Sequence, residues 1–293
     1  MSNVPGAVLD GMQATLGSLA LGTVDADGVA WYLQTLEGWD SPDSRSEFTD
    51  READHGSWAS PVYLSSRPIT LGGTIVAPSR DLLEDAMEQV RVAAGLADTV
   101  LTVAETVPKQ ATVRRSGKPL MQYITDTKAT YSVLVTAADP RRYSTTLSTA
   151  TTALPSTTGG LVLPATFPVT FSATTVAGSI TAANSGSIET RPILTITGPV
   201  TAPSIAALYP DGTVRQLIYA LDLAAGDVLT IDTDARTVLL NGTVSRRRFL
   251  TVSGPWPVIP AANNGPSVVT YQFQSPAYNA TATLTATWRS AWM

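Results

Sequence analysis

The chain has 293 residues, of which 44% are hydrophobic and only 15% are charged. This length favours two domains, and the abundance of Thr, Ser, Gly and Pro favours β-strands separated by frequent turns. The absence of cysteine excludes disulfides, thiolate catalysis and Cys-ligated metal sites. A net charge of −5 argues against a surface that coats nucleic acid. No apolar run is long enough to span a bilayer and no signal peptide is evident, so we expect a soluble protein, without membrane insertion, assembled in the cytoplasm.

The first half of the chain, residues 1–144, predicts an α+β domain. Its expected strands alternate apolar and polar residues, and one amphipathic helix is expected at about Arg80 to Ala94. Ser79 is suited to cap this helix. Gly72-Gly73 indicates a bulge or tight bend within a strand. The expected strands are Leu16–Val24, Val29–Leu36, Val62–Ala77, Thr99–Ala104, Gln110–Arg115, Leu120–Ile124 and Thr130–Ala138.

The stretch Gly38–Trp58 interrupts this pattern because it is polar and has almost no apolar periodicity. A polar segment of this length inside a compact domain is typical of a solvated loop, or of a loop that becomes ordered on contact with a partner. The two interpretations have about equal weight at this point. Its acidic residues are Asp40, Asp43, Glu47, Asp50, Glu52 and Asp54.

Residues 145–158 are rich in Thr and Ser and predict an extended linker or arm. From residue 159 to 293, many short strands separated by Gly, Pro and Asn turns predict a β-sandwich. The clearest signal is Gly226–Gly242, in which two alternating runs flank a polar turn and predict a β-hairpin. The remaining expected strands are Leu161–Leu163, Val169–Phe171, Gly178–Ala183, Ile193–Thr197, Ile205–Leu208, Arg215–Leu221, Val268–Phe273 and Ala280–Trp288.

The residues that could carry chemistry do not form a recognisable reactive site. His55 is the one histidine, and its neighbours Asp54 and Ser57 are too close in sequence to predict a triad. Asp232 and Asp234 have calcium-loop spacing but lack the further oxygen ligands, so a turn explains them better. Phosphate-binding glycine motifs are absent from the sequence. We therefore predict no catalytic residue, metal or cofactor, and a binding or structural protein rather than an enzyme.

Several stretches, read in order, together resemble the distal tail proteins of long-tailed, non-contractile bacteriophages. No single motif is specific, but the ordered set covers nearly the whole chain. The stretches of the first half are His55-Gly56, Arg67–Leu71 and Asp139–Tyr143. Those of the second half are Gly159-Gly160-Leu161, Phe167–Phe171, Asn184-Ser185-Gly186, Arg191–Pro199, the Gly226–Gly242 hairpin and Thr287–Trp292.

This resemblance implies a structural virion protein with a ring-forming belt domain followed by a galectin-like β-sandwich. It implies a ring, usually of six copies, at the distal end of the tail, with the tail tube protein on one face and tail-tip hub or receptor-binding proteins on the other. DNA would pass through the central channel. The acidic stretch Gly38–Trp58 is longer than in some relatives, and from its charge we hypothesise that it faces the channel and repels phosphate. Arginines that could contact a neighbouring subunit are Arg141, Arg142, Arg246, Arg247 and Arg248.

Two other functions compete with this reading. The β-sandwich could act as a carbohydrate- or receptor-binding module, with Trp256, Tyr271 and Tyr278 as sugar-stacking platforms. The alternative for these three rings is packing in the core or at its rim, which we favour. A tail-associated hydrolase would need a cleft with paired carboxylates, which the sequence does not indicate.

Overall fold

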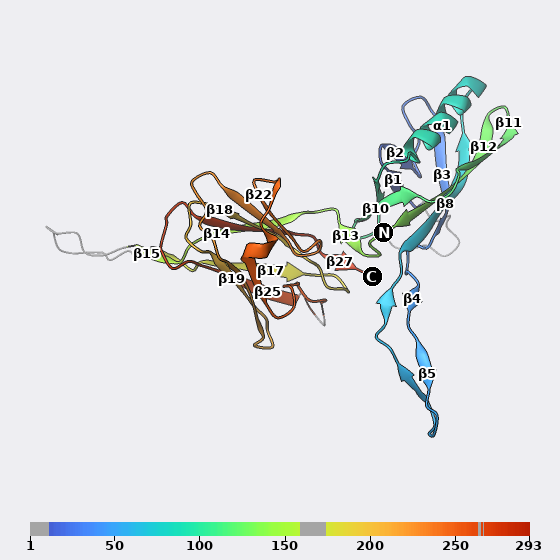
Figure 1. Ribbon diagram of the computed structural model, residues 1–293. Helices are drawn as coiled ribbons and strands as arrows, with labels where there is room; N and C mark the ends of the chain where they lie inside the picture. Colours follow the sequence, from blue (N-terminus) through green and yellow to red (C-terminus); the bar gives the residue numbers. More distant parts are fainter. Residues whose placement is uncertain (1–11, 159–173, 263–264, 266) are drawn as a thin grey trace. The chain divides into compact units, whose positions relative to one another are not determined.

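The computed structural model describes residues 12–158, 174–262, 265 and 267–293. The chain forms two compact units, residues 1–145 with residue 293 and residues 146–292. The predicted fold class is confirmed, because the described residues are mainly β with one α-helix (Figure 1). The predicted strands Leu161–Leu163 and Val169–Phe171 lie outside the described residues, as do the stretches Gly159-Gly160-Leu161 and Phe167–Phe171.

The first unit is built on an antiparallel sheet with the strand order β2-β1-β9-β10-β12-β8-β3. Two further strands pair beside this path, β11 with β12 and β13 with β10. The strands are β1 (Ala14–Leu16), β2 (Leu19–Leu21), β3 (Ala30–Glu37), β8 (Arg67–Val76), β9 (Thr99–Val103), β10 (Lys109–Arg115), β11 (Leu120–Thr125), β12 (Lys128–Ala137) and β13 (Arg142–Ser144).

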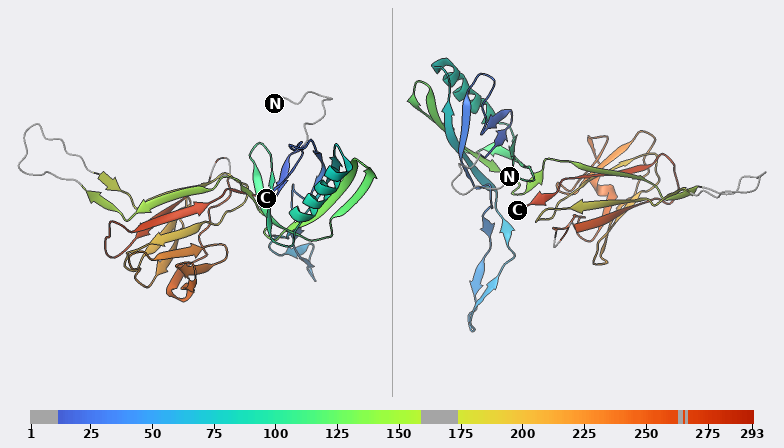
Figure 2. Two further views of the ribbon diagram at one scale, coloured as in Figure 1. Left: turned by 90° about the horizontal axis from the view of Figure 1, so that it is seen from above. Right: turned by 180° about the vertical axis from the view of Figure 1, so that it is seen from behind.

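Helix α1 (Arg80–Ala93) covers one face of this sheet (Figure 2). Ser79 caps it as predicted, accepting a hydrogen bond from the Leu82 backbone N–H. The helix buries Leu83, Met87 and Val90 against the sheet residues of the same core. Because helix α1 packs against one face of the sheet, buried side chains alternate with more exposed ones along β8 and β12.

The predicted irregularity at Gly72-Gly73 lies where β8 pairs with β3, whose register shifts between Leu33 and Thr35. A Cβ atom on Gly73 would lie 1.8 Å from the Tyr32 carbonyl oxygen. Only glycine therefore allows the two backbones to approach this closely.

The stretch expected as an acidic loop is instead a two-stranded arm, residues 43–65, that continues β3 and β8 beyond the sheet (Figure 1). The expectation of a loop was wrong. The stretch lacks the apolar alternation that indicates a strand, but hydrogen bonds across the arm need no such alternation. The Ser60 N–H donates to the Glu47 carbonyl at 2.9 Å, and the Glu47 N–H donates to the Ser60 hydroxyl at 2.8 Å. The arm strands are β4 (Ser44–Arg45), β5 (Phe48–Asp50), β6 (Ser57–Ala59) and β7 (Tyr63–Leu64).

The second unit is the predicted β-sandwich, with sheets of order β14-β26-β18-β21-β22-β23 and β17-β25-β19-β20-β24. Its core contains Tyr271, Phe273 and Trp288. The strands are β14 (Ser148–Ala153), β17 (Ser179–Asn184), β18 (Ile193–Thr197), β19 (Ser204–Leu208), β20 (Val214–Tyr219), β21 (Val228–Asp232), β22 (Thr237–Leu240), β23 (Val244–Ser245), β24 (Leu250–Ser253), β25 (Ser267–Gln274) and β26 (Thr283–Trp288).

The segment 145–158, expected as a linker or arm, contains two strands. Strand β14 pairs with β26 along its whole length, and β15 (Ser156–Thr158) pairs with β16 (Thr174–Val176). The run of Thr and Ser conceals the pairing, because hydroxyl side chains suit a half-exposed strand as well as a linker. Of this segment, Thr152 and Leu154 are buried.

The Gly226–Gly242 hairpin is confirmed, since β21 and β22 pair from Leu229–Leu240 to Asp232–Thr237. The Asp232 carboxylate accepts the backbone N–H groups of Asp234 and Ala235, at 2.8 and 2.9 Å, and so shapes the turn. Arg236 adopts a positive φ of 56°. Within the described ranges, no group of three or more His, Cys, Asp or Glu residues is placed to hold a metal ion.

Candidate functional site

The arm carries the most unusual surface of the first unit. Its large apolar side chains are exposed, at 67% for Phe48, 66% for Trp58, 64% for Val62 and 62% for Tyr63. None of them belongs to the core of the unit. Scattered exposed apolar residues are ordinary, but four on one thin hairpin indicate a surface that is covered in an assembly.

The arm presents apolar groups on both of its faces. Directly opposed residues of an antiparallel pair share a face, so Phe48 lies with Ala59, and Trp58 lies with Thr49 on the other face. The Arg51 guanidinium stacks 4.6 Å from the centre of the Trp58 ring on that second face. A contact on one side alone would therefore leave an aromatic ring exposed.

The six acidic side chains singled out from the sequence are all exposed, two near the root of the arm and four along it. Asp50 accepts a hydrogen bond from the Ser57 hydroxyl at 2.7 Å, and Asp54 lies 3.5 Å from Arg51. The arm is thus a largely polar ribbon that carries both exposed carboxylates and exposed aromatic rings.

Arg67 holds the root of the arm in place. Its side chain is fully buried and donates to the carbonyls of Pro140, Gly38 and Trp39, at 2.9, 3.2 and 2.5 Å. Burial, together with the nearby charge of Arg142, lowers the pKa of Arg67 to about 10. The Arg67 guanidinium thus links the segment that follows β3, where the chain enters the arm, to the segment that precedes β13.

A second charged cluster lies beside this root. Glu105 accepts hydrogen bonds from the Trp39 indole N–H, at 2.5 Å, and from the Lys109 ammonium, and lies 3.5 Å from Arg142. Burial alone would raise the pKa of Glu105, but these donors and the charge of Arg142 outweigh it and hold the pKa below its ordinary value. The cluster holds Trp39 in the core, and no pattern in the sequence indicates that Trp39 contacts charged residues.

The arginines predicted to contact a neighbouring subunit all have contacts within their own unit. Arg141 pairs with Asp139 at 3.2 Å, and Arg142 pairs with Glu105 and stacks on Trp39. The other three lie over aromatic rings, Arg246 and Arg248 over Phe249 and Arg247 over Trp256. A role of these arginines in contacts between subunits remains a prediction. The structure shows that each of them also has a partner within its own unit.

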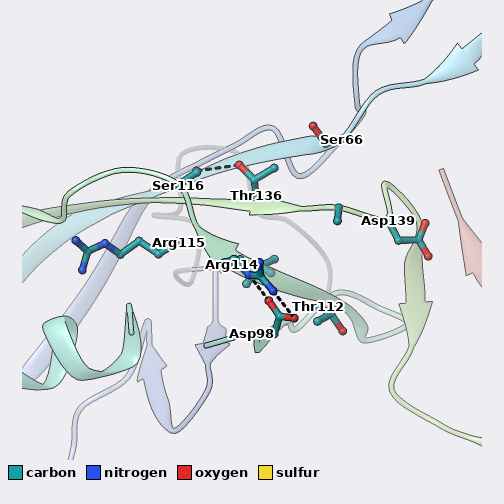
Figure 3. A pocket seen from close by; sticks show the side chains of 10 residues that line it. Ser66, Asp98, Thr112, Arg114, Arg115, Ser116, Thr136 and Asp139 are labelled. Atoms are coloured by element: carbon teal, nitrogen blue, oxygen red, sulfur yellow. Dashed lines mark hydrogen bonds and ion pairs between the residues drawn. The ribbon is translucent and has the colours of Figure 1, made fainter. Parts of the chain in front are cut away.

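A groove of about 480 Å³ lies at the point where β10 and β12 diverge (Figure 3). Its polar groups bind one another: Arg114 makes two hydrogen bonds to Asp98, at 2.6 and 3.0 Å, and the Thr136 hydroxyl donates to Ser116 at 2.8 Å. Asp139 at its edge accepts the Tyr143 hydroxyl at 2.5 Å. The groove therefore presents satisfied polar pairs rather than an activated nucleophile or base.

The three candidate sugar-stacking rings differ in exposure. Tyr271 is fully buried, with burial raising the pKa of its hydroxyl well above the ordinary value. Trp256 is partly buried against the core and covered by Arg247, 5.0 Å from its ring centre. Tyr278 alone of the three is well exposed, at 59%. The predicted packing role therefore holds for Tyr271 and Trp256.

The stretch Asn184-Ser185-Gly186 forms a buried joint in the sandwich. The Asn184 amide donates to the carbonyls of Ile188 and Pro260, and its oxygen accepts the N–H groups of Gly186 and Ala291. A Cβ on Gly186 would lie 1.8 Å from the Ala291 carbonyl oxygen. These contacts explain why an amide side chain stands at position 184 and a glycine at position 186.

The comparisons with known proteins agree with this architecture. Residues 185–292 match the family described as siphovirus-type tail component, C-terminal domain. The crystal structure of the SPP1 Dit protein, described as a hub of the adsorption apparatus of phages that infect Gram-positive bacteria, is similar with a TM-score of 0.62. That likeness covers 89% of this chain and 93% of the SPP1 protein at 10% identity. A chain of the phage P2 baseplate in its activated conformation with calcium is similar with a TM-score of 0.48, over 94% of this chain and 97% of that chain at 9% identity. The curated proteins include no match to the sequence.

The second unit thus matches, at residues 185–292, the C-terminal domain of the siphovirus-type tail components. The fold of the chain resembles that of the SPP1 Dit protein. The resemblance to distal tail proteins is confirmed. Among the described residues, no helix has the length and apolarity needed to cross a membrane.

Proposed function

We propose that this protein is a distal tail protein that forms a ring, of about six copies, at the end of the phage tail. The observation that supports this most is the likeness in fold to the SPP1 Dit protein, which covers 89% of this chain and 93% of that chain. The ring joins the tail tube protein on one face to the tail-tip hub or receptor-binding proteins on the other. Assembly takes place in the host cytoplasm.

The exposed apolar surface of the first unit supports a role in assembly. A monomer gains nothing from four large apolar side chains on a projecting arm, whereas an oligomer buries them. Repeated identical contacts between copies close into a ring when the rotation from one copy to the next completes a circle.

A central channel for DNA is part of this proposal. Acidic side chains that line a channel repel the phosphates of DNA and prevent it from adhering. Neutralising the six acids of the stretch 38–58 should slow DNA ejection from the assembled phage, and an unchanged ejection rate would count against their facing the channel.

Gold-labelled antibodies against the second unit test the position in the virion. Electron micrographs of intact phage should show gold at the tail end farthest from the capsid. Gold along the whole tail tube, or at the capsid, would contradict the assignment.

A further inference from the structure

The first unit has a second exposed apolar surface besides the arm. We call it the β11 patch, and it consists of Lys118, Leu120, Tyr123, Ile124 and Lys128. Leu120 is 55% exposed, Tyr123 is 48% exposed and Ile124 is 57% exposed. In the described part of the chain, β11 pairs with β12 only, so its other edge has free backbone donors and acceptors.

The β11 patch shows apolar groups on both faces, as the arm does. Leu120 lies opposite Ser132 on the solvent face of the sheet, whereas Tyr123 lies opposite Ala129 on the side of the helix. Ile124 is at the bulge between Tyr123 and Thr125. A ribbon that pairs with this edge would extend both faces of the sheet at once.

The charges of the two surfaces are complementary. The arm has five carboxylates, Asp43 at its root and Glu47, Asp50, Glu52 and Asp54 along it, against two arginines. The chain has only three lysines, and Lys109 is engaged with Glu105. Lys118 and Lys128 are exposed at the two ends of β11, and among the described residues neither forms an ion pair.

The two surfaces lie at opposite ends of the same unit. The arm begins beyond Arg67 at one end of β8, whereas Val76 at the other end pairs with Lys128 beside β11 (Figure 1). A strand of ten residues is about 30 Å long. The arm extends away from β11, so it cannot fold back onto the β11 patch of its own chain.

We propose that the arm of one copy adds edge to edge to β11 of a second copy. Backbone hydrogen bonds extend the sheet, and the alternating side chains provide specificity. Phe48 and Trp58 cover apolar side chains on the two faces of β11, and the arm carboxylates approach Lys118 and Lys128. This inference rests on the proposed ring and identifies the contact that closes it.

Because the donor and acceptor surfaces differ, the contact is head to tail. Such a contact leaves every open chain of copies with one free arm at one end and one free β11 patch at the other until a ring closes. The inference also assigns the four arm acids to a protein contact, which leaves Asp40 and Asp43 at the arm root as the candidates that face the channel.

Zero-length cross-linking tests this contact directly. A carbodiimide joins a carboxylate to a lysine amine only when the two are in contact, and Lys118 and Lys128 provide two readable acceptors. Copies labelled with ¹⁴N and ¹⁵N are mixed, so that peptides of mixed label report links between copies. We expect mixed-label links from Lys118 or Lys128 to the arm acids, and their loss in the K118R/K128R variant, which keeps the charge and the assembly.

Substitutions test the energetics of the same contact. K118E/K128E should weaken association about tenfold, because two attractions become repulsions. Trp58→Ala should weaken it by at least about tenfold. Leu96→Ala is the matched control, since Leu96 is 84% exposed but lies outside both surfaces. Circular dichroism should show that all variants are folded, because the changed side chains lie outside the core.

The outcomes separate this inference from the proposed function. If rings form but the mixed-label links avoid β11, or if K118E/K128E and Trp58→Ala assemble like Leu96→Ala, the docking site is wrong and the ring remains. If purified tail tube protein is added to the mixture and the arm acids link to that protein instead, the occupant is wrong. If the native chain stays monomeric at high concentration, the ring itself is wrong.

Discussion

Replacing Asn184 by alanine should destabilise the second unit severely, although the residue is polar and far from any reactive group. Asn184 is fully buried and makes four hydrogen bonds to backbone groups. It donates to Ile188 and Pro260 at 2.7 and 2.9 Å, and it accepts from Gly186 and Ala291 at 2.9 and 3.2 Å. Alanine would leave four buried backbone groups without their partners.

The size of the effect follows from these four bonds. A hydrogen bond contributes about 1 kcal/mol net, and a buried group left unpaired costs somewhat more, so we expect a loss of about 3–5 kcal/mol. Asn279→Ala is the matched control. Asn279 accepts two hydrogen bonds from Thr281 within one local turn, and its loss should cost about 1 kcal/mol or less.

Hydrogen exchange with mass spectrometry measures both units in the full chain. Amides of β18 and β25 should lose protection in Asn184→Ala, whereas those of β8 and β12 should not change, because they belong to the first unit. A loss below about 1 kcal/mol in the second unit, or an equal loss in Asn279→Ala, would refute the reasoning.

Three further predictions concern single positions. Gly186→Ala should destabilise the second unit because its Cβ would lie 1.8 Å from the Ala291 carbonyl, and native-like thermal unfolding would contradict this. Because the folded-state pKa of Glu105 is lowered, its contribution to stability is present above the ordinary pKa of 4.5 and is lost as the pH falls through the folded value. Glu105→Gln should therefore be less stable near neutral pH and lose less stability on acidification, which denaturant titrations at pH 6 and pH 3 measure; an unchanged acid slope would argue against the cluster. Tyr278→Ala should leave glycan-array signals at the level of the native protein, and a strong native signal lost in the variant would favour the lectin alternative.

Helix α1 and most strands could be predicted from the sequence, because their apolar residues recur with the spacing of a helix or of a strand. Helix α1 has both an apolar face and the Ser79 cap, and the hairpin of β21 and β22 has a turn-forming aspartate. Such signals are local, so they do not depend on distant parts of the chain.

The arm and the strand β14 could not be predicted in the same way. Neither segment has the alternation that indicates a buried face. Strand β14 pairs with β26, at least 130 residues further along the chain, whereas the arm strands pair with each other. The Trp39–Glu105 bond and the Arg67 contact with Pro140 span 66 and 73 residues. The tertiary fold brings these partners together, and no spacing of residues in the sequence predicts such contacts. The one available signal for the arm was the presence of Phe48 and Trp58 in an otherwise polar stretch.

The central claim is that this chain forms a closed ring, and mass photometry over a concentration series tests it most directly. The account predicts a species of about six subunits that persists on dilution and has no ladder of larger forms, since a closed ring leaves no free arm or β11 patch. A strict monomer at the highest concentrations, or an open series of ever larger species, would contradict it.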